Sequence, residues 1–304
     1  MTLTPRVAAL LLVPPLMWAG NAVVGRMLAD SVPPMRLNAL RWAAALLILL
    51  PLAWRAFATA KHRALMREGW PHLLARGGLG LGAYNSLQYL ALQTSSPINV
   101  TLIASSMPVW MLLVGLVRHG ERPRRVQWLG AVVSTLGVLA VLLRGNTTQL
   151  SWLRVVSREL CTLLRALSWS IYSWMLVRPP PSMQGDARPD WNWAEFLAVQ
   201  IAFGLLWSSA ATGAEVALGA QAGAWTAWHW AALAFIAIGP SVLAYRCWGV
   251  GVAAAGPTPA AFFANLTPLF ATLLAAMLLV EPPRLYHGVA FVLIVAGIAV
   301  SSRR

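Results

Sequence analysis

The stretch PINVTLIASSMPVWMLLVGLVRHGERP, from Pro97 to Pro123, returns in altered form from Pro257 to Pro283. Adding 160 to a residue number aligns the copies, and the identities include Ala104 with Ala264, Pro108 with Pro268, Glu121 with Glu281 and, further on, Gly137 with Gly297. In each copy a proline opens an apolar run of about 22 residues, with a second proline near its middle. Such a run spans a membrane as a helix, so the chain is predicted to repeat a set of membrane-spanning segments.

The composition of the whole chain fits a membrane protein. Of its 304 residues, 59% are hydrophobic and 11% are charged, whereas roughly 25% of the residues of a soluble domain are charged. All nine acidic residues lie in or beside breaks between apolar runs, and the net charge of +14 lies mostly in the short connections. Basic connections set topology and contact anionic lipid headgroups, so we expect membrane lipids as partners and no nucleic acid.

At about 20 residues per span, the sequence predicts an all-α polytopic membrane protein with ten transmembrane helices. The expected helices are 7–28, 33–54, 75–94, 97–118, 124–144, 157–177, 192–211, 226–250, 257–279 and 284–302. Equivalent helices lie five spans apart, an odd number, so residues 1–146 and 147–304 form two inverted five-helix repeats. Inverted repeats place a binding site near the bilayer midplane between the halves and allow alternating access to it.

The distribution of basic residues predicts the orientation of the chain. Lysine and arginine are more numerous in the connections that share a side with both termini, and this bias favours cytoplasmic N- and C-termini. The apolar run near the N-terminus is too long for a typical signal sequence, so we interpret it as the first span. The expected location is the inner membrane.

Polar and aromatic residues inside the expected helices are the candidate substrate-binding residues. A buried asparagine is costly unless it is bonded, so Asn265 either bridges helices or faces a polar cavity, whereas Ser105 is expected to bond back to its own helix. Tyr84 and Gln88 share one helix face, which does not face lipid. The full set is Trp18, Asn21, Tyr84, Asn85, Gln88, Ser105, Trp169, Tyr172, Tyr245, Trp248 and Asn265.

The midpoint prolines, Pro108 and Pro268, are candidate hinges. Each removes a backbone donor and releases the carbonyl group four residues earlier, at Ala104 and Ala264. In lipid a released carbonyl needs a partner or lines a cavity. Each proline therefore marks either a kink that only shapes packing or, since both copies have one, a hinge beside the central site.

Other intramembrane residues are assigned structural roles. Arg246 is interpreted as the one cation well inside an expected helix, with a structural or gating role, and Arg41 as a packing residue near the outer end of its helix. The glycines of the third helix are predicted to allow close helix packing rather than to bind a nucleotide. These glycines are Gly77, Gly78, Gly80 and Gly82.

The sequence contains no pattern typical of an enzyme. The five histidines lie at span ends or in connections without a carboxylate at helical spacing, and Cys161 and Cys247 lack metal-ligand spacing. We therefore expect no enzymatic activity, no cofactor and no metal. Since no acid lies at lipid depth in an expected span, where it could carry protons, any transport is expected to be uncoupled.

The chain resembles the drug/metabolite transporter superfamily, of the EamA type, along nearly its whole length. The resemblance rests on WAGNAVVGR, PPMRLNALRWAAA, PINVTLIASSMPVW through GERPRRVQWLGAVVSTLGVLAVL, and GPTPAAFFANLTPLFATLLAAMLLVEPPRLYHGVAFVLIVAGIAV. It implies ten helices in two inverted halves, cytoplasmic termini and transport of small metabolites.

Within that family the chain is most similar to exporters of aromatic and other hydrophobic amino acids. We therefore expect an inner-membrane carrier that exports such amino acids by alternating access through a central cavity. The alternative is a broad-specificity drug or metabolite exporter, with or without proton coupling. That alternative would predict a buried carboxylate to hold a cation, and the lipid-depth parts of the expected spans contain none.

Overall fold

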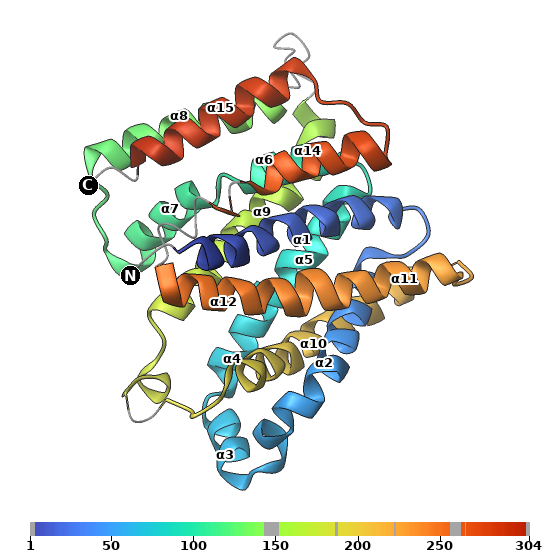
Figure 1. Ribbon diagram of the computed structural model, residues 1–304, viewed down its shortest axis with the longest axis vertical. Coiled ribbons are helices and arrows are strands. Elements are labelled where there is room, and N and C mark those ends of the chain that lie inside the picture. Colours follow the sequence, from blue (N-terminus) through green and yellow to red (C-terminus); the bar gives the residue numbers. More distant parts are fainter. Residues whose placement is uncertain are drawn as a thin grey trace.

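The structure is a computed structural model that describes residues 4–142, 152–185, 188–221, 223–255, 263–264 and 266–301. The described chain is a bundle of helices (Figure 1). The first half contains α1 (Pro5–Met27), α2 (Pro34–Ala58), α3 (Ala60–Glu68), α4 (Trp70–Gly77), η1 (Gly78–Ala83), α5 (Tyr84–Leu92), α6 (Pro97–Ala104), α7 (Met107–His119) and α8 (Arg125–Leu142). The second half contains α9 (Trp152–Val177), η2 (Pro181–Met183), α10 (Trp193–Ala217), α11 (Ala227–Ile236), η4 (Ala237–Leu243), α12 (Ala244–Ala255), α14 (Thr267–Leu278) and α15 (Leu285–Ser301).

Each of the ten expected spans contains helix, which confirms the all-α class, but three segments differ in detail. The expected span 97–118 is two helices, α6 and α7, which meet at 41°. The third span begins earlier than expected, because α4, η1 and α5 follow one another without a break. The connection after α2 contains an additional short helix, α3, whose residues are mostly exposed.

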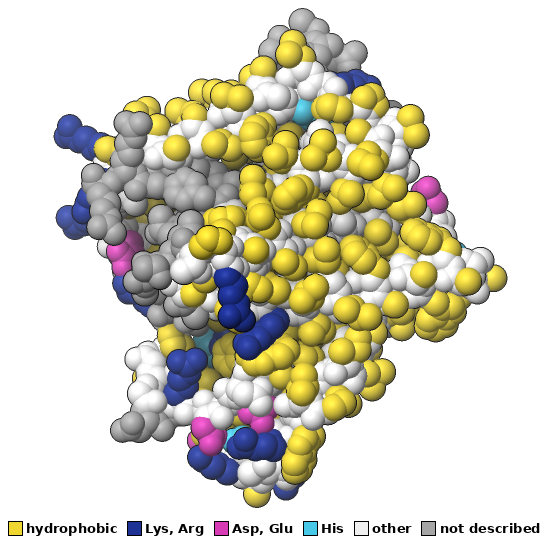
Figure 2. Space-filling view, in the orientation of Figure 1, with side chains coloured by type: hydrophobic (Ala, Val, Ile, Leu, Met, Phe, Trp, Pro, Cys, Tyr) yellow, Lys and Arg dark blue, Asp and Glu magenta, His cyan; other side chains and the backbone are white. Residues whose placement is uncertain are grey.

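By length and composition alone, four helical segments of the described chain can cross a membrane: α1, α2, α10 and the run 227–251. The bent pair of α6 and α7 is a fifth if the two helices form one span. Hydrophobic side chains cover most of the visible face of the molecule (Figure 2). Large apolar side chains such as Leu206 on α10 and Val292 on α15 are exposed. An apolar exterior of this extent suits contact with lipid.

Helices of the two halves pair in matched sets. The pairs α8 with α15 and α2 with α10 join equivalent helices of the two repeats, and Figure 1 shows α8 and α15 side by side. The contact of α1 with α12 has a counterpart in that of α5 with α9. Likewise α1 packs on α14 as α9 packs on α6 and α7. This matching is the pattern of an internal two-fold axis, so the halves interlock rather than form separate bodies.

The α8–α15 contact shows the two-fold relation at atomic detail. A Cβ atom on Gly297 would lie 2.5 Å from the carbonyl oxygen of Gly130 and 2.6 Å from the backbone nitrogen of Ser134. A Cβ atom on Gly137 would lie 2.9 Å from the carbonyl oxygen of Ala290. Adding 160 turns Gly130 into Ala290 and Gly137 into Gly297, so the two contacts are counterparts. Both require the absence of a side chain.

The π-helices η1 and η4 interrupt the third and eighth spans at equivalent positions. Adding 160 to the last residue of η1, Ala83, gives the last residue of η4, Leu243. A π-helix disturbs the regular backbone hydrogen bonds, and side chains of neighbouring helices bond to carbonyls of η1. The Leu79 carbonyl accepts from Ser168 Oγ at 2.8 Å, and the Leu81 carbonyl accepts from Asn38 Nδ2 at 3.1 Å.

The predicted packing role of the glycine run in the third span is confirmed. A Cβ atom on Gly77 would lie 2.5 Å from the backbone nitrogen of Gly204 on α10. One on Gly80 would lie 2.6 Å from the ring of Tyr172 on α9. The third span therefore contacts both neighbouring helices through its backbone. These contacts fix the position, along the helix axis, of the residues that follow the glycines.

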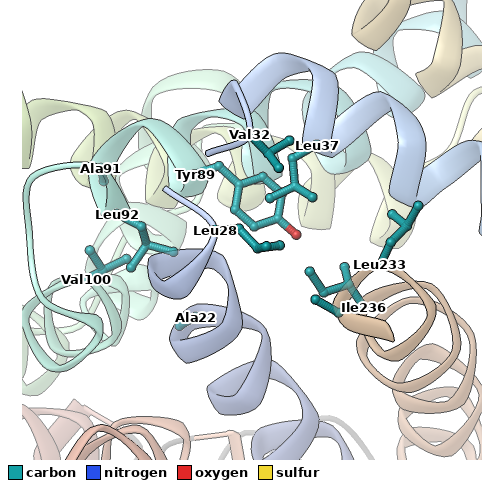
Figure 3. Close-up of a cluster of buried hydrophobic side chains, with 11 residues drawn as sticks. Ala22, Leu28, Val32, Leu37, Tyr89, Ala91, Leu92, Val100, Leu233 and Ile236 are labelled. Carbon is teal, nitrogen blue, oxygen red and sulfur yellow. The ribbon is translucent and has the colours of Figure 1, made fainter. Parts of the chain in front are cut away.

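An apolar cluster closes one end of the bundle around the ring of Tyr89 (Figure 3). Its buried members come from α1, α2, α5, α6 and α11 and from the turn after α1. The Tyr89 ring packs within this cluster, whereas its hydroxyl group belongs to the polar network described below. The members are Ala22, Leu28, Val32, Leu37, Tyr89, Ala91, Leu92, Val100, Ala232, Leu233 and Ile236.

Candidate functional site

Six of the predicted site residues form one group of contacting rings, here called the aromatic cluster. The group takes residues from α1 and α5 of the first half and from α9 and α12 of the second. It therefore lies at the interface between the halves, where the inverted repeat predicts a binding site. Its members are Trp18, Tyr84, Trp169, Tyr172, Tyr245 and Trp248.

Trp18 and Trp169 are the centre of the aromatic cluster. The Trp18 ring lies 6.5 Å from that of Trp169, 6.4 Å from that of Tyr245 and 5.6 Å from that of Trp248. The Trp169 ring lies 4.5 Å from that of Tyr84. Since a shift of 151 aligns Trp18 with Trp169, the repeat brings two equivalent tryptophans into contact near its axis.

The rings of the aromatic cluster are not completely buried. Tyr172 is buried, but the other five members keep partial exposure although they lie between helices of both halves. Aromatic rings with polar tips and accessible faces can hold an apolar ligand while bonding its polar groups. The cluster can therefore bind a small amphipathic molecule.

A polar network centred on Arg41 lies beside the aromatic cluster. Arg41 Nη1 lies 3.0 Å from Asn85 Oδ1, 2.9 Å from the Tyr89 hydroxyl and 3.3 Å from Asn21 Oδ1. Its Nε and Nη2 atoms donate to Ser241 Oγ at 3.1 Å and 2.7 Å. The Tyr89 hydroxyl donates to Asn21 Oδ1 at 2.8 Å. Arg41 therefore joins α1, α2, α5 and η4, which agrees with its predicted packing role.

The site residues Asn21 and Asn85 belong to this network rather than to the face of the aromatic cluster. Both side chains are buried, and the oxygen of each lies within hydrogen-bond distance of the guanidinium group of Arg41. Arg41 connects the network to the cluster, because its guanidinium lies 4.7 Å from the Trp42 ring and that ring lies 5.8 Å from Tyr245. The two asparagines are therefore linked to the aromatic cluster through Arg41 and Trp42.

A second polar contact is the repeat counterpart of the Arg41–Asn21 contact. A shift of 159 aligns α2 with α10 along their full lengths and places Arg41 on Gln200, while a shift of 151 places Asn21 on Tyr172. The Tyr172 hydroxyl donates to Gln200 Oε1 at 2.9 Å. Each half thus links its first helix to its second through one buried polar pair at the same position.

The prediction that Arg246 is the one cation inside a span is wrong. Its side chain is exposed and stacks on Trp193 at 4.7 Å, because it lies on the outer face of α12. Arg41, Arg76 and Arg165 are the buried arginines of the described chain. Arg165 is the functional candidate that sequence reasoning missed, although it lies one turn before Trp169 in the middle of an expected span.

Arg165 contacts the aromatic cluster through Tyr84. Its guanidinium group lies 4.3 Å from the Tyr84 ring, and Nη2 donates to the Tyr84 hydroxyl at 2.7 Å. Gln88 lies one turn beyond Tyr84 on the same face of α5 and is buried. The structure thus places a cation and an amide along the edge of the cluster.

The remaining predicted residues belong to the fourth and ninth spans. Ser105 Oγ donates to the Thr101 carbonyl at 3.0 Å, so it bonds within its own helix as expected. Pro108 is in the first turn of α7, directly after the break between α6 and α7, and Pro268 is at the same point of α14. Asn265 lies outside the described residues. The role of the equivalent prolines as hinges stays a prediction.

Polar contacts between the halves lie at both ends of the bundle. At one end, the Glu215 carboxylate accepts from the backbone nitrogens of Met35 and Arg36, both at 3.0 Å, and caps α2. At the other end, His62 Nε2 lies 2.7 Å from Asp190, and this hydrogen bond holds the pKa of Asp190 below its usual value. These contacts join the two halves at the two ends of the bundle.

Gly80→Ala is expected to push the Tyr172 ring out of place, because two ring atoms lie 2.6 Å from the new Cβ position. Tyr172 is buried and bonded to Gln200, so the ring cannot move freely, and the substitution should lower the free energy of unfolding by about 1–3 kcal/mol. Thermal unfolding in detergent, followed by tryptophan fluorescence, measures the effect. Gly213→Ala on α10 is the matched control, since no atom lies within 4 Å of its Cβ position. Equal melting temperatures for the two variants would contradict the prediction.

The chain is similar to known transporters along nearly its whole length. The EamA-like transporter family matches residues 6–143 and 157–303, one match for each half. The uncharacterized transporter YyaM of Bacillus subtilis is 24% identical over 260 residues, covering 86% of this chain and 80% of that protein. An uncharacterized transporter of Archaeoglobus fulgidus is 22% identical over 289 residues, or 95% and 94% of the two chains.

Two further similarities concern substrate and fold. A protein of Ancylobacter novellus named aromatic amino acid exporter YddG is 24% identical over 241 residues, covering 79% of this chain and 78% of that protein. A solved structure described as "Crystal structure of protein" superposes with a TM-score of 0.64 at 22% identity and covers 98% of this chain and 96% of the other. The second similarity concerns the fold alone.

Proposed function

Because this chain belongs to the EamA-like transporter family, and is therefore a multi-pass membrane transporter rather than an enzyme, we propose that it exports amino acids, aromatic and other hydrophobic ones included. It is an inner-membrane carrier with cytoplasmic termini that works by alternating access and without coupling to protons. The substrate lies in a central cavity walled by the aromatic cluster. The observation that carries this proposal is the contact of Trp18 with Trp169 between the halves, with both rings partly exposed.

The chemistry of the site supports an amino acid as the substrate. Aromatic rings provide apolar faces for a side chain, and their polar tips, with Gln88 and backbone carbonyls, provide partners for the ammonium and carboxylate groups. The name of the relative from Ancylobacter novellus, an aromatic amino acid exporter, points to the same substrate class. The substrate is thus expected to combine a zwitterionic end with an apolar or aromatic end.

A broad-specificity exporter of drugs or other metabolites, with or without proton coupling, remains the second candidate. An exporter of organic cations needs a counter-charge for its substrate, and the charged groups that stack on rings of the aromatic cluster in the described chain are two arginines, Arg76 and Arg165. Proton carriers are usually intramembrane Asp, Glu or His. In the described part of the chain no ion pair and no hydrogen bond links such a residue to the cluster.

Transport by the purified protein in proteoliposomes tests the proposal. Wild-type protein should take up labelled L-tryptophan and L-phenylalanine and should not accumulate a cationic dye. Trp169→Ala removes the central ring of the cluster and should lower uptake by about tenfold or more, since one large apolar side chain contributes roughly 1.5–3 kcal/mol. Gln88→Ala should also reduce uptake.

The control variant is Trp128→Ala, which removes an exposed tryptophan on α8. Preferential uptake of the dye would favour the second candidate, and unchanged uptake by both Trp169→Ala and Gln88→Ala would rule out the proposed cavity. In the same vesicles, an imposed pH gradient should not drive uphill accumulation of the amino acid. Such accumulation would show that transport is coupled to protons.

A further inference from the structure

The buried arginines of the described chain differ in how fully their donors are used. Arg41, Arg76 and Arg165 are 1%, 2% and 5% exposed. Every nitrogen of the Arg41 guanidinium group has a neutral acceptor. By contrast, Nε and Nη1 of Arg165 have no hydrogen-bond partner in the described chain, and Arg165 forms no ion pair there. A buried cation with free donors is costly, so such an arginine indicates a binding site.

The unused donors of Arg165 lie at the edge of the aromatic cluster. Its guanidinium group stacks on Tyr84 and is bonded to the hydroxyl of that residue, while the Tyr84 ring lies 4.5 Å from Trp169. The bond to Tyr84 fixes the orientation of the guanidinium and leaves two of its three nitrogens available. Arg165 is thus a preorganised cation next to accessible aromatic faces.

Gln88 adds a second unused donor on the same side of α5. Its Nε2 atom has no partner in the described chain, and its side chain is buried. Gln88 follows Tyr84 by one helical turn, so its amide lies on the helix face that carries the Arg165 contact. Guanidinium and amide donors without a nearby carboxylate select an anion, and guanidinium groups bind the planar carboxylate especially well.

We propose that Arg165, supported by Gln88, binds the carboxylate of the substrate while the aromatic cluster holds its apolar end. This proposal rests on the proposed function and specifies its chemistry: the carrier selects molecules with a free carboxylate and discriminates against the corresponding amides and amines. Arg76 also has unused donors and lies 6.0 Å from the ring of Tyr172, but Tyr172 is the buried member of the cluster, whereas the Tyr84 ring beside Arg165 is partly exposed. Arg41 has no unused nitrogen, so its role is structural.

Tryptophan and tryptophanamide, in which a neutral amide replaces the carboxylate, provide the test. Wild-type protein in proteoliposomes should prefer tryptophan. Arg165→Gln should lower tryptophan uptake by about tenfold or more and leave tryptophanamide uptake unchanged, because a hydrogen bond to a charged group contributes roughly 1.5–3 kcal/mol. The preference should therefore disappear. Arg165→Lys, which keeps the charge and loses the planar group, should retain part of it.

Arg246→Gln is the matched control, since it removes an exposed arginine that stacks on Trp193 outside the cluster. A wild-type preference for tryptophan that persists in a folded Arg165→Gln variant would overturn the carboxylate site and leave the proposed function intact. Absence of amino-acid uptake by the wild type would instead reject the proposed function. If Arg165→Gln does not fold, Arg165→Lys and Gln88→Leu test the carboxylate site in its place. Each of these variants must reduce the preference for tryptophan over tryptophanamide.

An inorganic anion could bind the same donors. Tryptophan uptake measured in chloride buffer and in gluconate buffer distinguishes an inorganic anion from the carboxylate of the substrate as the ligand of Arg165. Equal uptake in both buffers is expected if the carboxylate of the substrate is the ligand. A strict requirement for chloride would assign Arg165 to an inorganic anion and overturn the proposal.

Discussion

Arg41→Ala is expected to lower the free energy of unfolding by about 3 kcal/mol or more, since it removes several charge-assisted hydrogen bonds and leaves a buried acceptor without its donor. Asn85 Oδ1 loses the guanidinium donor, Asn21 Oδ1 keeps the Tyr89 hydroxyl alone, and Tyr89 and Ser241 each lose a partner. All four side chains are buried, so water cannot easily replace the guanidinium group. We expect little folded protein, and the melting temperature of what remains should fall by more than about 5 °C.

Size-exclusion chromatography and thermal unfolding in detergent measure this effect. Arg246→Ala is the control, because it deletes the same side chain from an exposed position on α12. Arg41→Lys should be intermediate, since a lysine supplies charge but cannot reach acceptors on three neighbouring segments at once. A fully stable Arg41→Ala variant would show that the network does not hold the helices together.

Gly297→Leu is expected to have the second large effect, by forcing α8 and α15 apart. The Cβ position of Gly297 lies 2.3 Å from Ser134 Oγ, 2.5 Å from the Gly130 carbonyl oxygen and 2.6 Å from the Ser134 nitrogen. Two of these atoms belong to the backbone, so a change of side-chain rotamer cannot relieve the clash. Overpacking of this kind typically costs about 1–3 kcal/mol, and rigid backbone contacts place this site at or above the upper end.

Gly288→Leu is the matched control on the same helix, because no atom lies within 4 Å of its Cβ position. Both variants add the same side chain to α15, so any difference in melting temperature reports the contact with α8. We expect Gly288→Leu to match the wild type and Gly297→Leu to yield less folded protein. Similar stability of the two variants would mean that the helices separate without cost.

Much of the fold could be predicted because the chain repeats itself. The shift of 160 identified the equivalent spans, and the matched contacts of Gly137 and Gly297 show the same relation in space. At Pro108 the sequence predicts a kink or a hinge but not the end of a helix, since a proline removes one donor but does not determine whether the helix bends or ends. The helix α3 was missed because its short polar sequence resembles a connection.

The candidate site was predicted in its residue types more than in its arrangement. Trp18 and Trp169 are both predicted site residues, and the structure brings their rings together. Asn21 and Asn85 were selected by polarity alone, which cannot show that a third residue, Arg41, occupies their oxygens. Position within a span does not distinguish the buried Arg165 from the exposed Arg246, because burial depends on which face of its helix each arginine occupies.

The π-helices η1 and η4 give the two halves of the chain the same irregularity at the same place. A π-helix accommodates more residues per turn than an α-helix, so it corresponds to an extra residue within a span. The end of η1 at Ala83 and the end of η4 at Leu243 coincide under the shift of 160. The widened turn is therefore a property of the repeated unit, and a change that removes it from one half would leave the third and eighth spans with unequal lengths on either side of the turn.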